Sequence, residues 1–364
     1  MAVEEQNEAA TNAASAKSKV EYSFSDGLLR RLSAINSSLA FTSYQSGLLY
    51  MLGASPKGGA QLHQSAMPKP MGLFSNGRNA LLMSSDAQLI RFENVLNEGQ
   101  RINQLYDACF MPRVQYVTGQ LDAHDVGFCD DGELVFVNTR YNCLSTVSER
   151  FSFKSIWKPP FISEIVDEDR CHLNGLAMRD GEPAFVTAVS RSNTIDGWRD
   201  RRVDGGVVVD VGRNEIVCEG LSMPHSPRWY DGRLWVLNSG TGELGFVGLG
   251  GGGLEEREGF NPVAFCPGFL RGLAIREGYA FVGLSRPRYK RFEGLALDKK
   301  LQDADSAPWC GVQVIELSSG TCVDWFRIDG EVAELYDLEL IDGVRCPMTV
   351  SPSSPDAATL ITFE

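Results

Sequence analysis

Short apolar segments separated by polar turns recur along most of the chain. Each unit starts with a strand-like run, passes through a turn that contains glycine, and continues into a second, strongly β-prone run. Two further short apolar segments follow within most units, and the whole pattern recurs about every 50 residues. The pattern predicts four-stranded sheets. The aligned copies lie at residues 71–85, 126–139, 174–190, 227–240, 271–285 and 337–351.

Six such units predict an all-β fold, a six-bladed β-propeller. The last copy supplies an inner strand in YDLELID but little after it, whereas the segment SLAFTSYQSGLLYML supplies strands with no inner strand before them. We therefore expect the C-terminal strand to close the first blade, which also removes an exposed sheet edge. Residues 21–364 are expected to form one propeller domain, and the polar residues 1–20 a disordered tail.

Two segments interrupt the repeat. The glycine-rich stretch 248–256 is expected to be a flexible loop between outer strands. Residues 285–310 form a long, charged insertion, which is either a lid or binding loop, or an exposed arm. The Asp-Gly pairs within the repeats are expected to be hairpin turns at the face where the inner strands end.

Charge and cysteine content narrow the possible partners and compartment. The chain has 34 Lys and Arg against 47 Asp and Glu, a net charge of −13, which disfavours nucleic acids and anionic membranes. No apolar run reaches the length of a membrane span. The nine cysteines include no CxxC motif, so they are expected to be reduced core thiols in a cytoplasmic protein.

Three of the four histidines stand just before the inner strand of consecutive repeats, as His124, His172 and His225. If the repeats surround an axis, the three imidazoles converge at one end of the central channel. Three neutral imidazoles suit one divalent transition metal, with zinc or manganese favoured and iron or copper also compatible, and they leave a coordination position open. The alternative is that they line the channel and hydrogen-bond to neighbouring loops or water.

The unit HSPRWYDGRLWVLNSGTGELGFV resembles the blades of NHL, SMP-30/gluconolactonase and peptidyl-amidating-lyase propellers. The segments LDAHDVGF, HLNGLAM, DGWR and LNSGTGEL also resemble a bacterial conserved-hypothetical family described only as a domain of unknown function. This second resemblance spans most of the chain and implies a fold without an established activity. Amidating-lyase and oligogalacturonate-lyase propellers hold a metal on the axis with three histidines, but the full motif of neither is present here.

The resemblance implies which residues surround the channel mouth, because inner strands and the loops between second and third strands share one face in such propellers. The candidate catalytic residues are Tyr141, Tyr336, Glu243 and Arg271. The candidate substrate-binding residues are Lys69, Asn138, Asn142, Asn193, Trp198, Arg228, Asn238, Phe269 and Arg286. Half of the mouth is thus expected to be rich in histidine, and the other half aromatic and basic.

These features favour a metal-dependent enzyme, a lyase or hydrolase acting on a small anionic or carbohydrate-like molecule. A metal-dependent oxygenase is a second possibility, against which the lack of a fourth clustered histidine counts. A non-catalytic propeller that serves as a binding or interaction platform is the third. The sequence leaves the substrate, the metal and the oligomeric state open.

Overall fold

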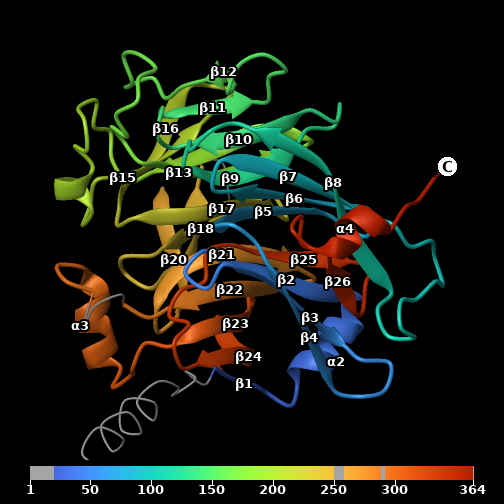
Figure 1. The fold of residues 1–364 in the computed structure, drawn as a ribbon. Coiled ribbons are helices and arrows are strands. Elements are labelled where there is room, and N and C mark those ends of the chain that lie inside the picture. Colours follow the sequence, from blue (N-terminus) through green and yellow to red (C-terminus); the bar gives the residue numbers. More distant parts are fainter. Residues whose placement is uncertain (1–19, 250–257, 288–291, 364) are drawn as a thin grey trace, which may run out of the picture.

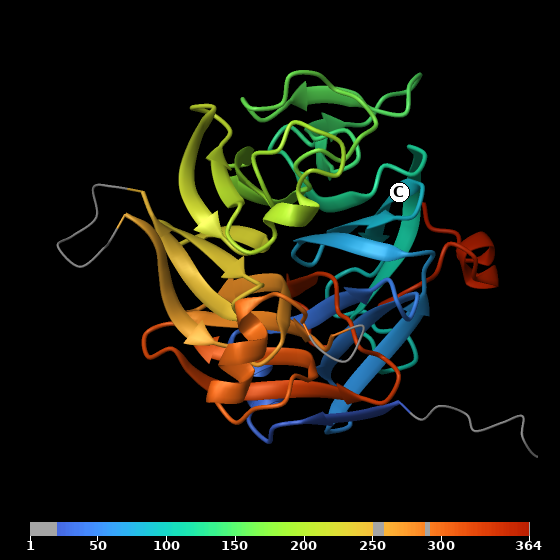
Figure 2. The same cartoon turned by 90° about the vertical axis from the view of Figure 1, so that its left-hand side faces the viewer.

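The computed structural model describes residues 20–249, 258–287 and 292–363, and it arranges them as six sheets around a central axis (Figure 1). Figure 2 looks onto the ring of blades. Strands are given from the innermost outward. The first blade consists of β25 (Leu338–Asp342), β2 (Ser37–Ser43), β3 (Leu48–Ala54) and β4 (Ala60–Ala66). The second consists of β5 (Pro70–Asn76), β6 (Ala80–Ser85), β7 (Gln88–Asn94), β8 (Ala108–Val117) and β26 (Pro347–Thr349), and the third of β9 (Ala123–Phe128), β10 (Leu134–Asn138), β11 (Cys143–Thr146) and β12 (Lys154–Trp157).

The other three blades follow the same order from the axis to the rim. The fourth blade consists of β13 (Leu173–Arg179), β14 (Glu182–Ala188), β15 (Gly206–Asp210) and β16 (Glu215–Leu221). The fifth consists of β17 (Pro224–Tyr230), β18 (Arg233–Asn238), β19 (Glu243–Gly248) and β20 (Gly259–Phe265), and the sixth of β21 (Phe269–Arg276), β22 (Tyr279–Ser285), β23 (Cys310–Glu316), β24 (Thr321–Asp329) and β1 (Glu21–Phe24). The helices are α2 (Leu28–Ala34), α3 (Ala296–Asp303), α4 (Pro355–Thr359) and the 3-10 turn Arg199–Arg201.

The ring closes as predicted. β25 pairs antiparallel with β2, with Leu340 opposite Leu39, so the C-terminal segment supplies the inner strand of the first blade. Consecutive inner strands contact one another around the axis, in the order β25, β5, β9, β13, β17, β21 and back to β25. This confirms the six-bladed propeller and its mode of closure.

Two strands extend the blades beyond the expected four. β26 pairs parallel with β8 at the rim of the second blade, and β1 pairs antiparallel with β24 at the rim of the sixth. The first and the last strand of the described chain are therefore both held against outer strands. The expected tail at residues 1–19 and the glycine-rich residues 250–257 lie outside the described residues.

The Asp-Gly pairs at 180–181 and 231–232 form tight turns, as the sequence predicts. Asp180 and Gly181 have φ values of 52° and 72°, and Asp231 and Gly232 have 49° and 73°. Positive φ at both central residues defines the hairpin turn that suits Asp-Gly. These turns connect the first and second strands of their blades, as expected.

The core consists of apolar side chains packed between neighbouring blades. Phe41 of the first blade stacks on Tyr50 at 4.9 Å between ring centroids and meets Phe326 of the sixth blade at 5.6 Å. All nine cysteines are free, and seven are buried among such side chains. This confirms the expectation of core thiols for seven of them, whereas Cys129 is half-buried and Cys322 is exposed.

Candidate active site

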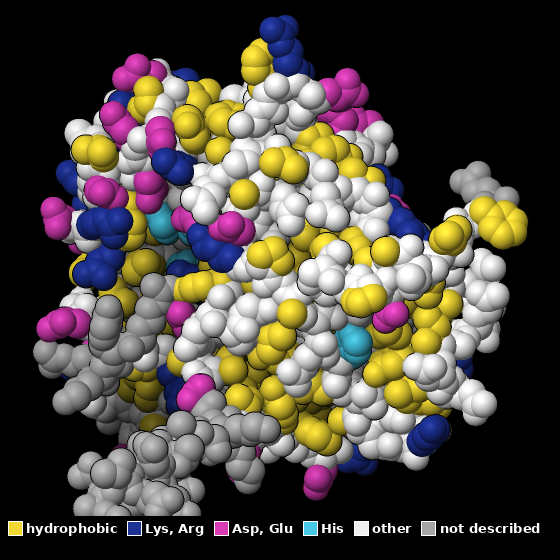
Figure 3. Space-filling model, viewed as in Figure 1, with side chains coloured by type: hydrophobic (Ala, Val, Ile, Leu, Met, Phe, Trp, Pro, Cys, Tyr) yellow, Lys and Arg dark blue, Asp and Glu magenta, His cyan; other side chains and the backbone are white. Residues whose placement is uncertain are grey.

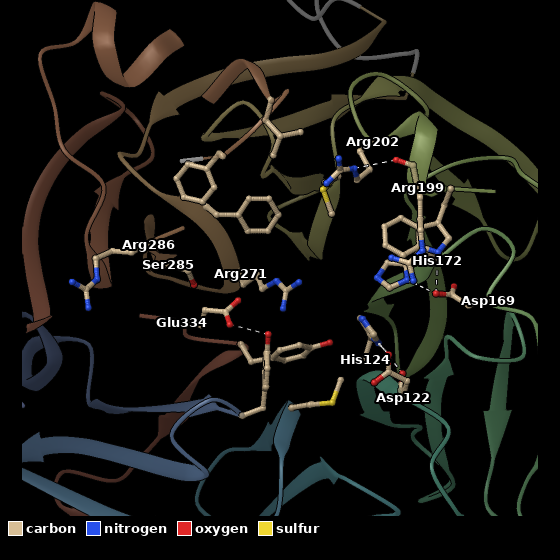
Figure 4. Close-up of a pocket in the computed structure, with 18 of the residues that line it drawn as sticks. Asp122, His124, Asp169, His172, Arg199, Arg202, Arg271, Ser285, Arg286 and Glu334 are labelled. Carbon is tan, nitrogen blue, oxygen red and sulfur yellow. Dashed lines mark hydrogen bonds and ion pairs between the residues drawn. The ribbon is translucent and has the colours of Figure 1, made fainter. Parts of the chain in front are cut away.

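A cavity of about 1010 Å³ opens at one mouth of the central channel, and residues from all six blades line it. In the space-filling view, histidine side chains are seen in a recess at the left-hand side, surrounded by acidic and basic side chains (Figure 3). The close-up shows His124 and His172 on one wall, with Arg271 pointing toward them from the other (Figure 4). Two of the three predicted histidines are thus brought together, with ring centroids 4.8 Å apart.

The strand register shows that the three histidines are not equivalent. β9 and β17 each begin one residue before a histidine and one residue after a left-handed residue, Asp122 (φ 53°) and Met223 (φ 48°). In β13 the left-handed residue is His172 itself (φ 52°). His172 therefore stands two positions earlier than His124 and His225, so the expectation of one shared repeat position is wrong for it. Pairing of the first strand residues supports this, with Ala123 opposite Asn138, Leu173 opposite Ala188 and Pro224 opposite Asn238.

Hydrogen bonds fix the tautomer of His124. Its Nδ1 lies 2.7 Å from the Asp122 carbonyl oxygen and 2.8 Å from the Thr139 hydroxyl. The Thr139 hydroxyl already donates to the Leu173 carbonyl at 2.6 Å, and a carbonyl can only accept, so Nδ1 must carry the proton. The free Nε2 then holds a lone pair. Burial lowers the pKa of His124 to about 4, which keeps this imidazole neutral at ordinary pH.

His225 repeats this arrangement two blades further on. Its Nδ1 contacts the Met223 carbonyl at 2.8 Å and the Ser239 hydroxyl at 3.0 Å, while that hydroxyl donates to the Leu270 carbonyl. Burial, with Arg271 as a second cause, lowers the pKa of His225 well below its usual value. Its Nε2 is buried without a hydrogen-bond partner among the described residues. His225 does not line the cavity and packs edge-on against Phe269 instead.

His172 forms a histidine–carboxylate pair. Its Nδ1 donates to Asp169 Oδ2 at 2.9 Å, and Trp198 Nε1 donates to the same oxygen at 3.0 Å. The Trp198 ring stacks on the imidazole at 4.1 Å between centroids. The carboxylate thus orients His172 with its Nδ1–H toward Asp169, so that the tautomer of the neutral imidazole has its lone pair on Nε2, and the indole ring restricts the imidazole plane.

Arg271 and Tyr336 face these histidines with unused polar groups. The Arg271 guanidinium lies 5.6 Å from the Phe269 ring centroid and 5.0 Å from that of Tyr336. Its Nε and the Tyr336 hydroxyl are buried without a partner among the described residues. Burial raises the pKa of Tyr336 well above its usual value, although Arg271 opposes the shift, so the phenol stays protonated. Unused buried donors that face a cavity are available to a ligand.

The cavity takes in about half of the residues that the sequence suggested. The predicted site residues that line it are Lys69, His124, His172, Trp198, Phe269, Arg271, Arg286 and Tyr336. Lys69 forms an ion pair with Asp122 at 3.0 Å. Arg286 donates to the Val332 carbonyl at 3.0 Å, while its Nε has no partner within the described part of the chain.

The predicted asparagines do not line the cavity, because their side chains cap backbone groups of the loops. The Oδ1 atoms of Asn138, Asn142 and Asn238 accept hydrogen bonds from the backbone amides of Tyr141, Cys171 and Ser222, respectively. Asn193 Oδ1 accepts from Ser163 and from Arg170. Their predicted role in substrate binding is corrected to one in loop structure.

Three other predicted residues also lie elsewhere. Tyr141 packs against Phe153 at 5.0 Å between ring centroids, and Glu243 pairs with Lys300 and accepts from Thr241. Arg228 lies further inside the channel and lines a second cavity of about 230 Å³. The assignments of Tyr141 and Glu243 as catalytic and of Arg228 as substrate-binding are therefore corrected.

The structure adds site residues that the sequence did not single out, above all Asp169. It precedes His172 by three positions, and the left-handed conformations of both residues (φ 35° and 52°) turn the carboxylate toward the imidazole. An acidic residue three positions before a candidate histidine is the one signal that could have suggested it. The insertion contributes as well, since Phe292 and Leu295 lie in the cavity wall, which favours a binding loop over an exposed arm.

The described residues include no group of three or more His, Cys, Asp or Glu side chains arranged to hold one metal ion. His124 and His172 approach each other, while His225 is turned toward Phe269. Coordination by all three histidines therefore stays a prediction.

Below the cavity, Arg228 meets three carboxylates inside the channel. It lies 3.2 Å from Asp125, 3.4 Å from Asp337 and 3.6 Å from Glu339. The two aspartates also accept backbone amides of the next inner strand, from Leu176 and Leu73. Burial and the charge of Asp125 raise the pKa of Asp337 to about 7, and burial raises that of Glu339 well above its usual value. The Arg228 guanidinium is thus the shared ion-pair partner of three buried carboxyl groups, two of which also link neighbouring inner strands through hydrogen bonds.

We expect Glu339→Gln to flatten the pH dependence of stability. A carboxyl with a raised pKa stabilises the fold below its unfolded value, near 4.5, and this contribution is lost as the pH rises toward the folded value. Relative to the variant, the wild type should lose about 1.4 kcal/mol of unfolding free energy per unit of upward shift. Urea titrations between about pH 4 and pH 8 measure this, and parallel curves would contradict it.

The fold and the site together define a six-bladed β-propeller with a cavity at one mouth of its channel, lined by both charged and apolar side chains. The chain belongs to the family described as a domain of unknown function, DUF4915, whose model matches residues 26–350. This confirms the resemblance seen in the sequence. No curated protein matches the chain. None of the helices in the described residues is long and apolar enough to cross a membrane.

Solved structures share the fold at low identity. A chain of a nidogen/laminin complex is 10% identical, with a TM-score of 0.50, over 84% of this chain and 99% of that one. Virginiamycin B lyase from Staphylococcus aureus is 9% identical, with a TM-score of 0.41, over 85% and 99%. A gluconolactonase from Xanthomonas campestris is 12% identical, with a TM-score of 0.45, over 80% and 86%. At 10% identity, the likeness to the nidogen/laminin chain shows the fold alone.

Proposed function

We propose that the protein is an enzyme of the lyase or hydrolase kind that acts on a small anionic molecule in the channel-mouth cavity. The observation that carries the proposal is the Asp169-held imidazole of His172, opposed across the cavity by the unpaired guanidinium of Arg271. A base with a free Nε2 and a fixed anion-binding group are the two parts that proton-transfer chemistry next to an acid group requires.

The charges of the cavity support an anionic substrate. The chain as a whole carries −13, yet the described residues of the cavity wall include five Lys and Arg side chains against four Asp and Glu. Lys69 and Arg199 are paired with Asp122 and Asp196. The described residues offer no carboxylate partner to the other three cationic side chains of the wall, which are Arg202, Arg271 and Arg286. Within the described part of the chain, Arg202 and Arg286 donate only to backbone carbonyls, so all three guanidinium groups keep donors for a planar anion such as a carboxylate.

The proposed roles follow from the geometry. Arg271 binds the anionic group, and His172 Nε2 takes a proton either from the carbon next to it or from an attacking water. The Tyr336 hydroxyl, which stays protonated, donates to the leaving group or to the developing oxyanion. In a lyase, the electron pair left on carbon forms a C=C bond as the bond to the leaving group on the neighbouring carbon breaks. In a hydrolase, the water oxygen bonds to the acyl carbon as the bond to the leaving alcohol breaks. In both cases the leaving group takes the proton that His172 has accepted, and Tyr336 acts as a hydrogen-bond donor.

The proposal is tested by incubating the purified protein with a panel of anionic esters, lactones and acids that can undergo β-elimination. Mass spectrometry follows the products, and His172→Asn serves as the inactive reference. Turnover by the wild type alone supports the enzyme. If no substrate reacts faster with the wild type than with the variant, a non-catalytic binding platform is the better account.

We also propose that the same cavity binds one divalent transition metal, with zinc or manganese favoured over iron or copper. It is supported by His124 and His172, which both line the cavity and whose Nδ1 atoms are held by hydrogen bonds, so that each can present Nε2 to an ion. We expect metal analysis of the purified protein to find about one ion per chain, lost in His124→Ala and His172→Ala. A metal-free protein whose melting temperature does not respond to added zinc or manganese would contradict this, and bound iron would favour an oxygenase.

A further inference from the structure

The segment inserted between β22 and β23 builds an apolar wall beside the proposed catalytic groups. Phe292 stacks on Phe269 with ring centroids 6.0 Å apart and planes 25° apart, and it is 9% exposed. Leu295 and Met223 line the same cavity. The wall thus offers carbon and sulfur surfaces to whatever occupies this side of the cavity.

Helix α3 holds this wall in place. Its Leu297 is fully buried, packs with Leu301 and Phe265, and donates its backbone amide to the Gly240 carbonyl at 2.9 Å. Lys300 of the same helix pairs with Glu243 of the fifth blade. The position of Phe292 is therefore set by packing and hydrogen bonding before any ligand binds, which lowers the entropic cost of using it.

The anion-binding group adjoins the apolar wall directly. Phe269, which stacks on Phe292, also lies under the Arg271 guanidinium at 5.6 Å. A ligand that places an anionic group on Arg271 therefore has its next few atoms against Phe269 and Phe292. Burying a ring-sized apolar group there is worth about 1.5–3 kcal/mol, which corresponds to roughly tenfold or more in affinity.

We infer that the substrate carries an apolar, ring-sized group joined to one carboxylate or phosphate, with the ring against Phe269 and Phe292 and the anion on Arg271. This inference rests on the proposed function of the cavity. A sugar ring fits the wall less well, because its hydroxyls need polar partners. The nearby Ser285 hydroxyl is already used, since it donates to the Leu335 carbonyl and accepts from the Leu335 amide.

Calorimetric titration of the full-length protein with four probes tests the inference. The probes are 3-phenylpropionate, propionate, phenyl phosphate and gluconate. We expect 3-phenylpropionate or phenyl phosphate to bind at least about tenfold more tightly than propionate, and the tighter of the two identifies the anion. Phe292→Ala should remove this advantage, and Leu295→Gln should reduce it if the first variant folds poorly. Phe151→Ala, at a 64% exposed phenylalanine, is the matched control.

The outcomes separate this inference from the proposed function. Equal binding of propionate and 3-phenylpropionate, or tighter binding of gluconate, overturns the apolar group while leaving the anion site standing. Arg271→Met should weaken every anion by about 10-fold to 100-fold. If no probe binds, or if Arg271→Met changes nothing, the proposed anionic substrate fails as well.

Discussion

Replacing His172 by asparagine is expected to lower kcat by about 10²-fold to 10⁴-fold, the usual contribution of a positioned proton-transfer group. Asparagine cannot take up a proton at the place where the Nε2 lone pair faces the cavity. KM should change little, because the anion is bound by Arg271 on the opposite wall. Steady-state kinetics on the substrate found in the panel measures both constants.

Asp169 is expected to matter for the same proton transfer. Asp169→Asn removes the carboxylate that accepts from both His172 and Trp198, so the imidazole loses its fixed tautomer and the rate should fall by a comparable factor. His63→Asn is the matched control, since His63 lies on outer strand β4 and bonds to Ser65 and the Thr349 carbonyl. A His172→Asn rate within about threefold of wild type would rule out the proposed base.

The propeller could be predicted because the pattern of strands and turns that defines one blade is repeated along the chain. Every blade carries the same spacing of strands and turns, and a missing strand at each end predicts closure between β25 and β2. The added strands β1 and β26 could not be predicted. They are four and three residues long and pair with partners far away in the chain, so no local pattern distinguishes them from loops.

The site could be predicted only in part, because the position of a residue in the repeat does not by itself decide whether its side chain reaches the cavity. His225 matches His124 in register and in both Nδ1 partners, yet it packs against Phe269. His172 breaks the register but faces His124, because its own left-handed backbone turns it inward. Polarity was also a misleading signal, because Asn138 accepts the backbone amide of Tyr141 in its own loop and Asn238 accepts that of Ser222 in the loop before β17.

The channel below the site carries the largest expected effect on stability. Arg228→Met should lower the free energy of unfolding by about 3–5 kcal/mol near pH 8, because it leaves Asp125, Asp337 and Glu339 buried without a cation. The loss should be smaller near pH 5.5, since without Arg228 these carboxyls protonate more readily and no longer bury charge. Urea unfolding followed by tryptophan fluorescence at both pH values measures the difference.

Arg213→Met provides the control for that experiment. Arg213 also pairs with an aspartate, Asp210 at 3.0 Å, but its side chain is 56% exposed, so its loss should cost at most about 1 kcal/mol at either pH. An Arg228→Met variant no less stable than this control near pH 8, or one that loses more stability at the lower pH, would show that the three acids are not held by Arg228. In that case the inner strands depend on backbone hydrogen bonds such as those of Asp125 and Asp337 rather than on the charge of Arg228.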